Sequence, residues 1–149
     1  MSTAGKLGNC GLWPSGSDVW ISVPHSASLA LTTGITISAW VYVTGSVGAS
    51  SSSIIHKGGQ NAGYYYLLGT TANKASLSAA LAWVQYPTTV ITLNAWHHLV
   101  VSYDSSTVRH YLNGATNGTN SFAGTMNTAT YPLLIGHRRI SETPGNAPF

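Results

Sequence analysis

Apolar and polar residues alternate along residues 35–43, which read ITISAWVYV. The odd positions are Ile, Ala or Val, and the even positions are Thr36, Ser38, Trp40 and Tyr42. Successive side chains of a β-strand point to opposite faces of the sheet, so this period of two predicts a strand. Because both faces carry bulky side chains, we expect a central strand covered on both sides. Trp40 and Trp96 are accordingly expected in the core.

Shorter apolar and β-branched runs, separated by Gly, Pro, Ser and Asn, predict further strands. Helical periodicity is nearly absent, because the one run of helix formers, residues 79–83, is short and is soon followed by Pro87. The pattern predicts a single all-β domain over residues 1–149, built as a sandwich or a barrel. Besides the segment above, strands are expected at residues 18–23, 54–57, 63–69, 75–84, 90–93 and 131–136.

Residues 96–114 predict a β-hairpin. Asp104-Ser105-Ser106 are expected to form the turn, and Asn113-Gly114 supply residues that tolerate positive φ. The adjacent His97 and His98 should lie on opposite faces of their strand, with His98 beside His110 across the hairpin. The six histidines lack the Cys or carboxylate spacing of a zinc site, so we expect them to have structural roles.

Asn117-Gly118-Thr119 fits the acceptor pattern for N-linked glycosylation. An Asn-Gly pair is also a common turn, and the turn is the more economical interpretation.

Composition narrows the class of protein. Hydrophobic residues make up 44% of the chain, whereas charged residues make up only 6%, against roughly 25% in an ordinary soluble domain. The net charge is +3, but the basic residues are scattered, so no nucleic-acid interface is expected. No stretch reaches the length of a membrane span. Such weakly charged β proteins are common outside cells and on virions, so we expect an extracellular or virion-surface location.

A set of short motifs occurs in an order that resembles a laminin-G-like domain of the concanavalin A-like lectin/glucanase superfamily. The motifs lie at residues 5–9, 16–24, 29–31, 35–41, 54–58, 96–104 and 133–136. The resemblance implies a jelly-roll sandwich of two antiparallel sheets. Lectins, glycosidases, adhesion modules and phage structural proteins all use this fold, so the resemblance does not imply one function.

Two strands that such domains usually contain are not evident, one before residue 5 and one of the Ile-Asp-Glu-Val-Arg-Ile type after residue 136. We therefore expect a domain that is incomplete at both ends. A sheet without these strands would expose unpaired backbone groups. A protein partner or a second copy of the chain is expected at that open sheet edge.

Three functions are compatible with this fold. The first is a non-catalytic binding or adhesion module with carbohydrate as its ligand. The alternative is a structural assembly protein, such as a phage virion or surface component, and the third is a glycoside hydrolase. Glycoside hydrolysis usually needs two facing carboxyl groups, and the Glu-x-Asp-x-x-Glu strand of the glucanases is absent from this chain. We therefore expect no enzyme.

Calcium is the one cofactor that the resemblance suggests, because relatives often bind it at the rim of the sandwich. Asp18 is the best-placed carboxylate, although a turn at the start of a strand explains it equally well. The chain has only three acidic residues, and calcium prefers six to eight oxygen ligands. No tight site is expected.

Aromatic residues gather in the middle third of the chain, near polar side chains that could bind sugar hydroxyls. The apolar face of a sugar ring stacks on an aromatic plane, so this region is the predicted carbohydrate-binding site. The alternative is that these aromatic residues belong to the core. The candidate ligand-binding residues are Tyr64, Tyr66, Trp83, Gln85 and Tyr86.

Overall fold

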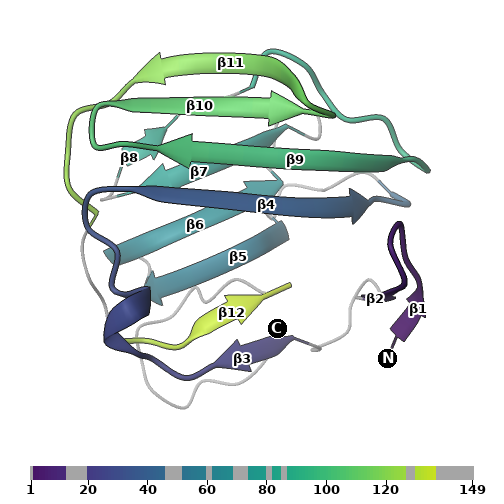
Figure 1. Ribbon diagram of the computed structural model, residues 1–149, viewed down its shortest axis with the longest axis horizontal. Helices are drawn as coiled ribbons and strands as arrows, with labels where there is room; N and C mark the ends of the chain where they lie inside the picture. The colour runs from purple at the N-terminus through teal and green to yellow at the C-terminus, as the bar shows by residue number, and fades with distance from the viewer. Residues whose placement is uncertain are drawn as a thin grey trace.

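A computed structural model describes residues 2–12, 20–45, 52–59, 62–68, 74–79, 82–84, 87–126 and 130–136. Regular structure within them is β-strand, apart from one 3-10 turn, η1 (Ala27–Leu29). Two antiparallel sheets pack against each other across a shared apolar core (Figure 1). The prediction of an all-β jelly-roll sandwich is confirmed.

The smaller sheet has four strands among the described residues, in the order β11–β10–β9–β4. The predicted hairpin is present in it, because β9 and β10 pair Tyr103 with Val108 and Leu99 with Leu112. Asn113 and Gly114 have φ values of 52° and 84°, the left-handed values predicted for the second turn. The strands are β4 (Ile35–Tyr42), β9 (Trp96–Tyr103), β10 (Thr107–Leu112) and β11 (Ala115–Ser121).

The larger sheet, counted over the same residues, has six strands in the order β3–β12–β5–β6–β7–β8. These strands are β3 (Ile21–Val23), β5 (Ser52–Gly59), β6 (Ala62–Leu68), β7 (Ala75–Ala79), β8 (Ala82–Val84) and β12 (Leu133–Ile135). A separate N-terminal hairpin pairs β1 (Ser2–Ala4) with β2 (Asn9–Gly11). The single strand predicted over residues 75–84 is thus described as two strands, and residues 90–93 form none.

Strand β9 shows how the alternation builds the core. Leu99, Val101 and Tyr103 are buried, whereas the residues between them are half-buried, as predicted. The facing sheet contributes Leu77 of β7, and Ile91 reaches the core from a loop. The buried cluster consists of Ile37, Ala75, Leu77, Ile91, Leu99, Val101, Tyr103, Val108 and Met126.

Strand β4 does not have the predicted central position. It lies at the end of the four-stranded sheet and, among the described residues, pairs with β9 alone. Its odd residues face the core, with Ile37 buried, and its even residues are exposed. The expectation that Trp40 lies in the core is wrong, because its side chain is 41% exposed. Trp96 is half-buried on the same outer face rather than in the core cluster.

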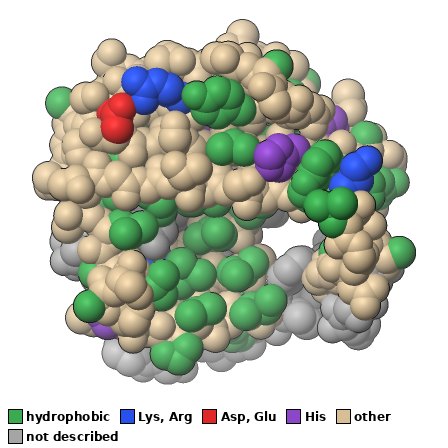
Figure 2. Space-filling model, in the orientation of Figure 1, with side chains coloured by type: hydrophobic (Ala, Val, Ile, Leu, Met, Phe, Trp, Pro, Cys, Tyr) green, Lys and Arg blue, Asp and Glu red, His purple; other side chains and the backbone are tan. Residues whose placement is uncertain are grey.

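The two sheets differ in width, so part of the larger sheet has no described strand over it. β12 and β3 lie beyond β4 in Figure 1, and Figure 2 shows hydrophobic side chains gathered on this part of the surface. Ile21 of β3 is in register with Ile135, and Ile135 with Ile55, which packs against the core. Ile21 itself is exposed. The protein partner or second copy expected at an open sheet edge stays a prediction.

The turn predicted at Asn117-Gly118 is wrong, because both residues lie inside β11. Arg109 pairs with Thr119 and Tyr111 with Thr116, so two residues of β11 lie opposite one residue of β10. This is a β-bulge, and Gly118 has a φ of 119° that side-chain-bearing residues rarely adopt. Asn117 is buried, and its Oδ1 accepts a hydrogen bond from the Thr89 N–H at 2.8 Å. Folded Asn117 is therefore not accessible for glycosylation.

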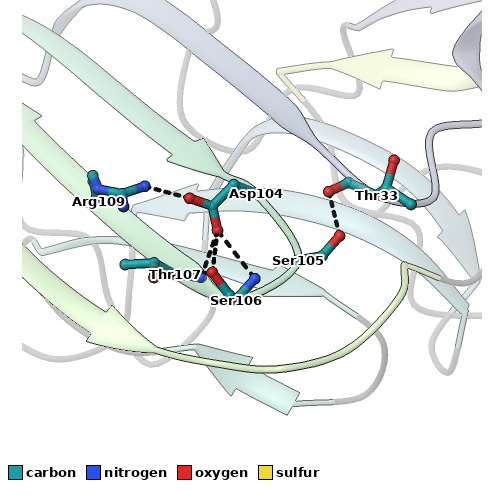
Figure 3. Close-up of polar contacts among 6 residues, drawn as sticks. All are labelled: Thr33, Asp104, Ser105, Ser106, Thr107 and Arg109. Atoms are coloured by element: carbon teal, nitrogen blue, oxygen red, sulfur yellow. Dashed lines mark hydrogen bonds and ion pairs between the residues drawn. The ribbon is translucent and has the colours of Figure 1, made fainter.

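Asp104 organises the turn between β9 and β10 (Figure 3). Its Oδ1 accepts hydrogen bonds from the N–H groups of Ser106 and Thr107, at 3.0 and 2.8 Å. Its Oδ2 accepts one from Arg109 Nη1 at 2.6 Å. The Arg109 guanidinium, followed by the Ser106 and Thr107 donors, holds the pKa of Asp104 well below its usual range. The Ser105 hydroxyl donates to the Thr33 carbonyl and so links this turn to the segment before β4.

This lowered pKa predicts a specific loss of stability in acid. Below the unfolded-state pKa of about 3.9, the unfolded chain binds a proton at Asp104 more readily than the folded chain does. The stabilisation by this carboxylate is thus present above that pH and is lost as the pH falls toward the lower folded pKa. Thermal unfolding followed by circular dichroism should show a smaller drop in Tm between pH 6 and pH 3 for Asp104→Asn than for the wild type. Equal drops would contradict the assignment, since both proteins keep Asp18 and Glu142.

Candidate ligand-binding face

The outer surface of the four-stranded sheet carries aromatic side chains on its two strands nearest the open edge. Trp40 and Tyr42 of β4 are 41% and 46% exposed, and Trp96 and His98 of β9 lie beside them. Large exposed aromatic side chains gathered on one sheet face are unusual unless they bind something. We call this surface the aromatic face; it consists of Ser38, Trp40, Tyr42, Trp96 and His98, together with Lys6.

The register of β4 with β9 sets the geometry of the aromatic face. Trp40 is the partner of His98, and Tyr42 is the partner of Trp96. The rings of the first pair are stacked, with centroids 5.1 Å apart, and those of the second are tilted, with centroids 5.5 Å apart. Because residues two apart along a strand share a face, the two pairs form successive rungs spaced by about 7 Å.

His98 is held in place by hydrogen bonds on both sides. Its Nε2 lies 2.8 Å from the Ser38 hydroxyl, and its backbone N–H donates to Asn113 Oδ1 at 2.9 Å. His97 points the other way, into the molecule, where its Nε2 lies 3.0 Å from the carbonyl oxygen of Thr92. The prediction that these histidines face opposite sides is confirmed. The predicted alignment of His98 with His110 is wrong, because His110 is buried and pairs with Val101.

Lys6 reaches the aromatic face from the N-terminal hairpin. Its Nζ lies 5.4 Å from the centroid of the Trp40 ring, a cation–π distance. Figure 2 shows histidine, hydrophobic and lysine side chains adjacent to one another at the end of the sheet near this hairpin. The contact joins residues 34 positions apart, so the spacing along the chain could not indicate it.

The chemistry of the aromatic face suits the binding of a ligand that is partly apolar and partly polar. Exposed aromatic rings offer apolar surface, and Ser38, His98 and Lys6 offer hydrogen-bonding groups next to it. The one carboxylate among the described residues, Asp104, lies at the far end of β9 and is engaged by Arg109. No group of three or more His, Cys, Asp or Glu in the described part of the chain could hold a metal ion. Asp18, the predicted calcium ligand, lies outside the described residues.

The backbone register separates the ligand-binding residues predicted from the sequence. Tyr66 of β6 pairs with Leu77, and Trp83 of β8 pairs with Ser78. Leu77 and Ser78 are neighbours along β7, so positions 66 and 83 belong to opposite faces of the sheet. Position 64 pairs with Ala79, on the same face as position 66. Gln85 and Tyr86 lie outside the described residues, and the site in the middle third stays a prediction.

The sequence already contained one signal for the aromatic face. The alternation in residues 35–43 puts Ser38, Trp40 and Tyr42 together on one side of their strand. What it could not indicate is that this side is exposed, with no described strand packed over it. Bulky residues on both faces predicted a strand buried on both sides, whereas the aromatic ones are in fact exposed.

The family comparison covers most of the chain. The model of the Laminin_G_3 family, described as the concanavalin A-like lectin/glucanases superfamily, matches residues 15–149. No curated protein matched the chain in a sequence search.

Many solved structures share the fold, and three of them are compared with this chain. The binding domain of Paraclostridial Mosquitocidal Protein 1 is 14% identical, with a TM-score of 0.72 over 91% of this chain and 37% of that one. The second is Domain 4 of AbnA, a GH43 extracellular arabinanase from Geobacillus stearothermophilus, in complex with arabinotriose. It is 17% identical, with a TM-score of 0.69, and the match covers 94% of this chain and 67% of that one. The third is a structure of botulinum neurotoxin type C, whose cell entry depends on interaction with two ganglioside molecules. It is 14% identical, with a TM-score of 0.57, and the match covers 97% of this chain and 35% of that one.

These likenesses show the fold alone, and this chain spans about a third of the length of the mosquitocidal protein chain and of the neurotoxin chain. Among the described residues, no helix has the length and apolar character needed to cross a membrane.

Proposed function

Because the chain belongs to the Laminin_G_3 family of the concanavalin A-like lectin/glucanases superfamily, we propose that it is a non-catalytic module that binds carbohydrate on the aromatic face. The observation that carries the proposal is the exposure of Trp40 and Tyr42 on one sheet face beside polar groups. A sugar presents an apolar C–H face and a rim of hydroxyls. The aromatic rings would contact the C–H face of the sugar, and Ser38 and His98 would form hydrogen bonds with its hydroxyl groups.

The similar structures support a binding role without specifying a ligand. Two of them are described as a binding domain and as a domain in complex with arabinotriose, and the third concerns ganglioside interaction. The second belongs to an extracellular enzyme and the third to a neurotoxin, which supports the proposal that this chain also acts outside the cell. The superfamily also contains glucanases. Hydrolysis of a β-glucan, abolished by Asp104→Asn, would replace the proposed function with that of a glycoside hydrolase.

Removing the exposed rings is the direct test. We expect Trp40→Ala and Tyr42→Ala each to weaken binding by about tenfold or more on a glycan array, followed by calorimetry with the best ligand, because each removes a stacking surface. Both side chains are exposed, so both variants should keep the circular dichroism spectrum of the wild type. Trp20→Ala is the matched control, since Trp20 is also exposed, at 36%, but lies outside the aromatic face.

The competing proposals give different results in the same assay. Loss of binding in Trp83→Ala, with Trp40→Ala unaffected, would move the site to the middle third of the chain. No binding to any glycan, together with defined oligomers in light scattering, would instead favour a structural assembly protein of a virion or other surface.

A further inference from the structure

The aromatic face carries a positive charge that no described residue neutralises. Lys6 is exposed and lies over the Trp40 ring, and it forms no ion pair with the described residues. The one described carboxylate, Asp104, follows the last residue of β9, whereas Trp96 and His98 lie at the start of that strand. Eight residues of strand separate Trp96 from Asp104, a span of about 26 Å and well beyond the Debye length in physiological salt.

The Lys6 ammonium, which forms no ion pair with a described residue, changes which sugars the face should prefer. A ligand that stacks near Trp40 removes water from Lys6, because the Lys6 Nζ and the Trp40 ring lie only 5.4 Å apart. Removing water from a charge is unfavourable unless the ligand supplies a partner of opposite charge. A neutral sugar offers only hydroxyl groups to Lys6, whereas an acidic sugar offers an anion. Ser38 and His98 remain available for hydroxyl groups of either ligand.

We infer that the aromatic face recognises acidic carbohydrate, meaning sugars that carry a carboxylate or sulfate group, and that Lys6 is the residue that determines this preference. The inference rests on the proposed function, because it concerns the same face. The anion would sit beside the Lys6 ammonium at the edge of β4, while the sugar ring packs against the parts of the Trp40 and Tyr42 side chains that are exposed beside His98 and Lys6. The cation–π contact positions the ammonium before the ligand arrives.

The test compares matched acidic and neutral ligands. The probes are trigalacturonic acid against its methyl ester, sialyllactose against lactose, and sulfated lactose against lactose, on an array and by calorimetry. We expect the wild type to favour the acidic member by about fivefold, the effect of one partly exposed ion pair. The preference should shrink as the salt concentration rises. Lys6→Met should bring the ratio of acidic to neutral affinity to about one, whereas Lys6→Arg should retain the preference.

The possible results of this binding comparison lead to different conclusions. A preference for the carboxylate pairs but not the sulfate pair, or the reverse, identifies the anion. Equal binding of acidic and neutral members by the wild type overturns the inference and leaves the proposed function standing, as long as Trp40→Ala still weakens binding. An acidic preference that persists in Lys6→Met also overturns it, because another cation would then be responsible. If no sugar binds, the proposed function itself fails.

Discussion

Replacing Leu99 by alanine is expected to lower the free energy of unfolding by about 3 to 4 kcal/mol and the Tm by about 10 °C. Leu99 is 1% exposed and lies in the buried cluster between the two sheets. Removal of three carbon atoms there loses apolar burial and leaves a cavity. Ile37 of β4, Leu77 of β7 and Met126 belong to the same cluster. Because both sheets contribute to it, the cavity weakens the contact that holds the sandwich together.

Urea unfolding followed by tryptophan fluorescence measures this loss. Val100→Ala is the matched control, because Val100 is the next residue of β9 but faces outward and is only half-buried. Its effect should stay below about 1 kcal/mol, since surface positions away from special features change stability little. If the two variants destabilised the protein equally, the assignment of the inner and outer faces of β9 would be wrong.

The β-bulge in β11 is the second place where a single substitution should lower the stability of the protein strongly. Gly118 has a φ of 119°, and we expect Gly118→Ala to lower the free energy of unfolding by about 2 kcal/mol through backbone strain. An added Cβ would lie 3.4 Å from the Cα of Pro87, so simple crowding contributes little. The strain can be relieved only by moving the bulge. That shift would pull Asn117 away from Thr89, whose N–H donates a hydrogen bond to Asn117 Oδ1 at 2.8 Å.

Gly45→Ala provides the control for Gly118→Ala. A Cβ at Gly45 meets nothing within 4 Å, and its backbone is not left-handed, so the same chemical change should be near neutral there. Hydrogen exchange adds a local readout. The amides of Thr88 and Thr89, which donate to Asn117 in the wild type, should lose protection in Gly118→Ala and keep it in Gly45→Ala. Unchanged protection in both variants would show that the bulge does not hold this loop.

The local structure of the chain, meaning the faces of its strands and two of its turns, could be predicted from the sequence. The alternation in residues 35–43 and 96–103 assigned each residue to one of two faces, because successive side chains of a strand must point to opposite sides. The turns at Asp104 and at Asn113-Gly114 were also predicted, since a side-chain acceptor and tolerance of positive φ act within a few residues. The prediction failed at Asn117-Gly118, where the same pair occupies a bulge whose position depends on the register with β10.

What the alternation could not decide is which face of β4 is covered. That depends on how far each sheet extends, and therefore on strands far away in the sequence. The tertiary structure places Trp40 and Tyr42 on the uncovered side, and brings Lys6 to the Trp40 ring from another hairpin. The sequence by itself determined most of the longer strands, the two faces of β4 and β9, and the fold family, because these follow from local periodicity and ordered motifs. Only the tertiary structure decided where the aromatic face lies and which charge accompanies it, because burial and long-range contacts arise when the sheets pack.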